Sequence, residues 1–141
     1  MRETMKPFIL AFTLLILSST SSVYADTLDY LMKATVRIRG NKYGSGTVFN
    51  KSETKYYILT NAHVVEDNEI VSVDFFNNGT LVRSVSGKVI WKILERNRKL
   101  DLAIVEVSRS SLIGYRPNVI KLAPINTYIS VNSKVYSMGF P

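Results

Sequence analysis

The sequence predicts an all-β domain, built as an antiparallel barrel or a sandwich. Several short segments alternate apolar and polar residues, which is the pattern of half-buried strands. Gly, Asn and Ser residues separate these segments at close spacing, and the hairpin signal Asn78-Gly79 lies among them. Convincing helical periodicity is missing between the segments. This pattern excludes alternating β-α units and favours packed antiparallel strands.

The first half of the chain supplies four predicted strands. Residues 34–39, with the sequence ATVRIR, alternate small or apolar side chains with polar ones and form the first strand. Shorter strands are predicted at residues 47–49, 56–60 and 71–75, each bounded by Gly, Asn, Ser or charged residues. Residues 26–33 are expected to form one short helix before the first strand.

The second half begins with the tight turn at Asn78-Gly79, from which a long strand returns. One face of this strand is predicted to hold Val85, Gly87, Val89, Trp91 and Ile93. Another apolar strand follows at residues 101–107, with the sequence DLAIVEV. Residues 108–127 are expected to connect it to a last strand at residues 133–138.

The N-terminus has the order of a secretory signal peptide. Arg2 and Lys6 precede an apolar run at residues 8–17, and small polar residues then lead to Ala25. The run is about half of the ~20 residues that a helix needs to span a bilayer, so no stable membrane anchor is expected. We expect cleavage after Ala25, which gives a signal peptide at residues 1–25, one domain at residues 26–141, and an exported protein in the periplasm or outside the cell.

The formal net charge of +7 is scattered along the chain. Arg96, Arg98 and Lys99 form its densest group, without interleaved aromatic residues or a nucleic-acid motif, so a solvated loop is expected and no nucleic-acid partner. The chain has no cysteine, which excludes disulfides. A single histidine and no cysteine leave no recognisable ligand cluster, so no metal and no cofactor are expected.

His63 is the only histidine of the chain, and it directly follows a predicted strand in the segment ILTNAHVV. Histidine side chains titrate near pH ~6.5 when unperturbed, so a neutral ring can accept a proton from a hydroxyl and return it to a leaving group. A lone histidine in such a position is nevertheless more often structural than catalytic. His63 therefore needs a second residue to support a catalytic role.

Asp101 is the candidate for that second residue. It opens an apolar strand, where a carboxylate that approaches the core needs a hydrogen-bond donor. An imidazole N–H is one such donor, and its bond to the carboxylate would fix the tautomer of the ring. Backbone amides at the start of the strand are an equally good source of donors. Both alternatives stay open from the residues alone.

Three local motifs occur in a specific order: GSGTVF at residues 44–49, LTNAHVV at residues 59–65 and DLAIVEV at residues 101–107. Together with VYSMGFP at residues 135–141, this order resembles the HtrA/Do-like serine proteases of the trypsin fold. The resemblance covers residue 33 to the end of the chain. It implies a trypsin-like antiparallel β-barrel, with the first barrel at about residues 34–122 and the start of the second barrel of a two-barrel protease.

The resemblance also implies roles for the candidate residues. His63 would be the general base of a Ser-His-Asp triad and Asp101 its orienting acid, in an endopeptidase acting on peptides or unfolded proteins. The family's GNSGG-type segment, which supplies the nucleophile, is expected beyond Pro141, so this chain alone is expected to be inactive. Ser45 precedes the histidine and is assigned to a structural Gly-Ser-Gly turn. The alternative function is a noncatalytic binding or regulatory remnant.

Overall fold

The computed structural model describes residues 25–95, 97 and 99–140. The predicted signal peptide lies outside these residues, apart from Ala25. Two units are distinguished, Met1–Tyr30 and Leu31–Pro141. The described residues of the first unit are helical, as are residues 31–34 at the start of the second, where the sequence predicts a short helix. Among the residues described, no helix is both long enough and apolar enough to cross a membrane.

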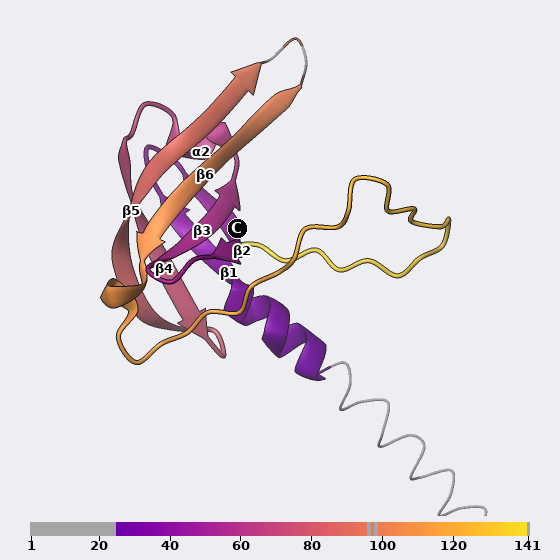
Figure 1. The fold of residues 1–141 in the computed structure, drawn as a ribbon, viewed down its shortest axis with the longest axis horizontal. Coiled ribbons are helices and arrows are strands. Elements are labelled where there is room, and N and C mark those ends of the chain that lie inside the picture. Colours follow the sequence, from indigo (N-terminus) through magenta and orange to yellow (C-terminus); the bar gives the residue numbers. More distant parts are fainter. Residues whose placement is uncertain (1–24, 96, 98, 141) are drawn as a thin grey trace, which may run out of the picture. The chain divides into compact units, whose positions relative to one another are not determined.

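Six antiparallel strands of the described chain close into a barrel (Figure 1). They are β1 (Thr35–Arg39), β2 (Tyr43–Lys51), β3 (Lys55–Thr60), β4 (Ile70–Asn77), β5 (Thr80–Glu95) and β6 (Leu100–Ser108). Around the barrel their order is β1-β2-β3-β6-β5-β4. A short helix, α2 (Ala62–Val65), follows β3, and a 3-10 helix, η2 (Arg109–Leu112), follows β6. The predicted antiparallel barrel is therefore confirmed.

Where the strands are regular, alternate residues point into the barrel and form its core, because successive side chains of a strand face opposite sides. The residues that are completely buried in this way include Val36, Ile38, Val48, Ile58, Val73, Phe75, Ala103, Val105 and Val107. On β5 the inward position is Gly87, where a Cβ atom would lie 2.5 Å from Cγ1 of Val105. Glycine is required there because neighbouring valines already fill the space.

The face predicted for β5 is wrong beyond Val89. The pairing with β6 shifts between Val89 and Trp91, so that Val89 lies opposite Val105 whereas Trp91 lies opposite Ile104. A one-residue bulge sends all following side chains to the other face of the strand. Trp91 therefore lies on the outside of the barrel, with 46% of its surface exposed.

The last strand predicted at residues 133–138 is also wrong. These residues have no regular secondary structure, and none of the described strands pairs with them. The alternation of side chains in this segment suits a strand, but a strand forms only when a neighbour satisfies its backbone N–H and C=O groups.

Asp74 on β4 is a charged residue that is completely buried. Its Oδ2 atom accepts hydrogen bonds from Nε and Nη2 of Arg37 at 3.1 and 2.8 Å, and its Oδ1 atom accepts one from Nη2 of Arg39 at 3.0 Å. Burial alone raises the pKa of Asp74, but hydrogen bonds from Ser84 and both arginines outweigh burial and lower it. The carboxylate therefore joins β1 to β4 as an ion.

Asp74→Asn is expected to lower the free energy of unfolding by about 3 kcal/mol in urea at pH 7. Breaking a buried ion pair costs about 3 to 5 kcal/mol. The lower end of this range is expected here because the side chains of Arg37 and Arg39 are 34% and 39% exposed. As a control, Glu106→Gln breaks the more exposed pair with Lys55 and is expected to cost less than about 1 kcal/mol.

The loss of stability in Asp74→Asn is expected to depend on pH. Because the folded-state pKa of Asp74 is lowered, its contribution to stability is complete above the unfolded pKa of ~3.9 and is lost as the pH falls through the folded pKa. The stability difference between wild type and Asp74→Asn is therefore expected to shrink below pH ~4. A difference that stays constant down to the acid transition would contradict the ionised pair.

Candidate active site

His63 lies on α2, the helix that starts directly after β3. Asn61 precedes this helix in an extended conformation, and its side-chain amide donates a hydrogen bond to the backbone carbonyl of Asp101 at 2.9 Å. The buried hydroxyl of Thr60 donates to the carbonyl oxygen of Ser45 on β2 at 2.8 Å. The start of α2 is thus tied to both β6 and β2.

Two glycines let α2 pack closely against β1 and β2. A Cβ atom on Gly44 would lie 2.4 Å from Cγ2 of Val64, and one on Gly40 would lie 2.6 Å from the carbonyl oxygen of the same residue. Larger residues would therefore push the helix that carries His63 away from the barrel. The turn predicted at Gly44–Gly46 is wrong, since these residues lie within β2. Close packing, and not a turn, accounts for the glycines.

The structure brings His63 and Asp101 together across 38 positions of sequence. Nδ1 of His63 lies 2.5 Å from Oδ2 of Asp101, and the backbone N–H of His63 donates to Oδ1 of Asp101 at 3.0 Å. Both donors considered for the carboxylate, an imidazole and a backbone amide, are therefore present on the same residue. The side chains of His63 and Asp101 are 48% and 32% exposed, so the pair lies at the surface of the barrel.

Asp101 stays ionised in this arrangement. Burial alone raises the pKa of its carboxyl group, but the backbone and ring hydrogen bonds from His63 outweigh burial and lower it. An ionised carboxylate accepts a hydrogen bond from a protonated Nδ1. In the neutral ring, this tautomer leaves the lone pair on Nε2. In the part of the chain that the structure describes, no group forms a hydrogen bond with Nε2. The free nitrogen is available as a proton acceptor.

Ser45 is not a partner of His63. Its hydroxyl oxygen accepts a hydrogen bond from the backbone N–H of Phe140 at 2.6 Å. This agrees with the expectation that Ser45 has a structural role, although it lies in a strand and not in a turn. Within residues 25–95, 97 and 99–140, there is no group of three or more His, Cys, Asp or Glu side chains that could hold a metal ion.

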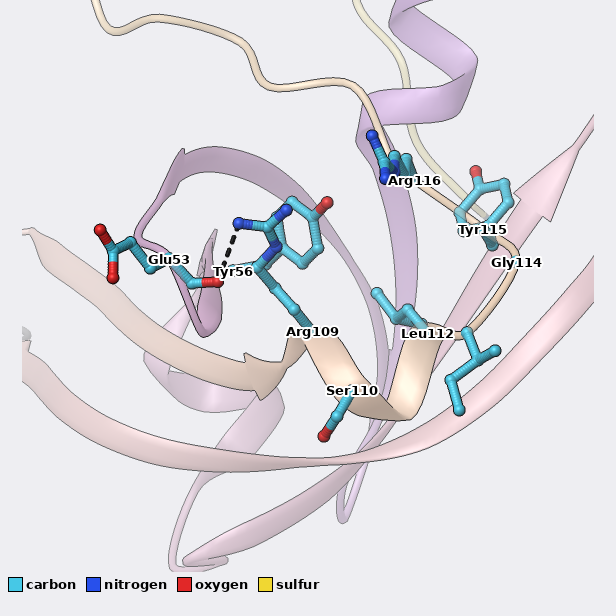
Figure 2. Close-up of a pocket in the computed structure, with 9 residues that line it drawn as sticks. Glu53, Tyr56, Arg109, Ser110, Leu112, Gly114, Tyr115 and Arg116 are labelled. Carbon is cyan, nitrogen blue, oxygen red and sulfur yellow. Dashed lines mark hydrogen bonds between the residues drawn. The ribbon is translucent and has the colours of Figure 1, made fainter.

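Two cavities lie at different ends of the β3–β6 pair. One of about 400 Å³ borders the helix of His63 and is lined by Ala62, Glu66, Asp67, Lys92 and Leu94. A larger one, of about 610 Å³, includes Tyr56 and Arg109 in its lining (Figure 2). In the register of the two strands, Tyr56 pairs with Val107 and Thr60 pairs with Ala103, so the larger cavity lies at the end away from His63. The smaller cavity is the one that borders the candidate site.

Asn61 and Gly44 help to hold the segment of His63 in place, and sequence reasoning missed both. Both lie in the motifs LTNAHVV and GSGTVF, but their partners are Asp101 and Val64, which are distant in sequence. The resulting arrangement is a histidine ring that is hydrogen-bonded to a carboxylate through Nδ1, with 48% of the histidine side chain exposed. Such a pair can take a proton from a hydroxyl placed next to Nε2.

The chain is similar to several known proteins. Residues 44–141 match the family model of the trypsin-like peptidase domain. The chain is 41% identical over 70 residues to a protein named serine protease HtrA-like in Staphylococcus aureus strains USA300 and NCTC 8325 / PS 47, a match that covers 50% of this chain and 8% of each relative. The chain therefore spans less than a tenth of the length of these relatives. The NSP4 proteinase from Equine Arteritis Virus superposes with a TM-score of 0.46 at 19% identity, covering 64% of this chain and 39% of that one.

Proposed function

Because the chain belongs to the trypsin-like peptidase family, we propose that it forms part of a serine endopeptidase that cleaves peptide bonds with a Ser-His-Asp triad. His63 is the general base of this triad and Asp101 is its orienting acid. The observation that carries the proposal is the contact of 2.5 Å between Nδ1 of His63 and Oδ2 of Asp101, while Nε2 has no hydrogen-bond partner among the described residues.

In the proposed reaction, Nε2 of His63 removes the proton of a serine hydroxyl while the serine oxygen attacks the carbonyl carbon of the peptide bond. The carboxylate of Asp101 keeps the proton on Nδ1 and stabilises the imidazolium that forms. The tetrahedral intermediate then breaks its C–N bond, and the imidazolium donates its proton to the leaving amine. Water repeats the same two steps on the acyl-enzyme and releases the acid.

The proposal places the serine nucleophile and the oxyanion-binding amides in sequence that follows Pro141. It rests on the family's order of His, Asp and Ser, and on Ser45 being bonded to Phe140 instead of His63. Peptides or unfolded proteins are the proposed substrates. The signal peptide predicted at residues 1–25 supports export to the periplasm or the cell exterior as the proposed place of action.

A serine-directed fluorophosphonate probe and a peptide library test the proposal. The chain extended by its downstream sequence is expected to cleave peptides internally and to be labelled on a serine beyond Pro141. The chain of 141 residues should show neither property, because a base without a nucleophile cannot form the acyl-enzyme. An extended protein that folds but neither cleaves nor is labelled would favour the noncatalytic remnant, and labelling of Ser45 would contradict the assigned roles.

A further inference from the structure

Residues 139 and 140 are held against β2 and β4 by three separate contacts. The hydroxyl oxygen of Ser45 accepts a hydrogen bond from the backbone N–H of Phe140 at 2.6 Å. It also lies 3.4 Å from the carbonyl oxygen of Phe140. Gly139 comes so close that a Cβ atom there would lie 3.0 Å from Oγ of Ser45. The ring of Phe140 packs on the ring of Phe76, with centroids 4.6 Å apart. One side chain of the barrel thus satisfies the backbone of a segment 95 positions away.

Ser45 is also linked to the helix that carries His63. Its carbonyl oxygen accepts the hydroxyl of Thr60, the last residue of β3 before Asn61 and α2. Its neighbour Gly44 is the residue against which Val64 of α2 packs. Ser45 therefore contacts Thr60, three residues before His63, through its backbone, and residues 139 and 140 through its side chain.

We propose that Ser45 is a positioning residue, which fixes where the chain leaves the barrel relative to His63. This inference rests on the proposed function, in which the nucleophile follows Phe140 in sequence. The serine oxygen must reach hydrogen-bond distance of Nε2, and a misplacement of about 1 Å costs on the order of 100-fold in rate. A fixed exit point reduces that misplacement.

The test compares Ser45→Ala with Ser86→Ala in the extended protein. Ser86 is a matched control because it is an exposed strand serine whose side chain has no hydrogen bond within the described residues. Ser45→Ala is expected to lower kcat by about 10- to 100-fold with little change in KM, since chemistry and not substrate binding depends on the alignment. Ser86→Ala is expected to keep the wild-type kcat, and both variants should unfold near the wild-type midpoint.

Amide hydrogen exchange of Phe140 in the chain of 141 residues gives a second reading that does not need activity. Ser45→Ala is expected to speed this exchange by at least about 10-fold, because the amide loses its acceptor. Faster exchange together with an unchanged kcat would overturn the positioning role while leaving the proposed function intact. An extended wild type without peptidase activity would overturn both, and the exchange at Phe140 would then report a purely structural contact. Unchanged exchange would show that the hydroxyl does not hold the segment.

Discussion

His63→Ala in the extended protein is expected to lower kcat on the order of 10⁶-fold, the loss seen when the base of a Ser-His-Asp triad is removed. The effect is large because His63 is the only histidine of the 141 residues, so this chain offers no second imidazole to take its place. The side chain is 48% exposed and its removal leaves no buried cavity. The measurement is single-turnover and steady-state hydrolysis of one peptide identified from the library.

Folding of the His63→Ala protein is checked separately by circular dichroism and thermal unfolding. Arg116→Ala serves as the control, because Arg116 is exposed and lines the cavity at the end of the β3–β6 pair away from His63. This control is expected to keep the wild-type rate. Hydrolysis that stays undiminished in folded His63→Ala protein would overturn the proposed mechanism.

Local patterns were enough to predict most of the barrel. Alternation at residues 34–39 predicts β1, and the turn signal Asn78-Gly79 predicts the hairpin between β4 and β5, in which both residues have positive φ angles. The bulge near Ile90 could not be predicted in this way, because it is a property of the pairing between β5 and β6. The segment at residues 133–138 shows the same limit, since its strand-like alternation meets no described partner strand.

At the candidate site too, the sequence predicts the residues but not the contacts between distant segments. The residues alone gave His63 and Asp101 as candidates and left two donors open for the carboxylate; the fold places both donors on His63. The sequence predicts a Gly-Ser-Gly turn that includes Gly44, and only the fold shows that Val64 occupies the space of its missing side chain. The bond between Ser45 and Phe140 spans 95 positions and leaves no local signal in either segment.

Asp101→Asn is expected to lower kcat by roughly 10⁴-fold, the effect of this substitution in the chymotrypsin-type triad. The structure supplies the reason. Oδ1 of Asp101 accepts the backbone N–H of His63, and Oδ2 accepts the proton on Nδ1. An asparagine whose oxygen keeps the backbone bond presents its NH₂ group to Nδ1. The ring then places its proton on Nε2, where it can no longer accept one from a serine.

Asp101→Ala separates the tautomer effect from the loss of the carboxylate. Alanine removes the acceptor without presenting a donor to Nδ1, so Asp101→Asn is expected to be at least as inactive as Asp101→Ala. Nitrogen NMR of the His63 ring gives the direct measurement: the proton is expected on Nδ1 in the wild type and on Nε2 in Asp101→Asn. An asparagine variant that keeps the Nδ1 proton, or that hydrolyses peptide within about 10-fold of the wild-type rate, would show that Asp101 does not orient the base.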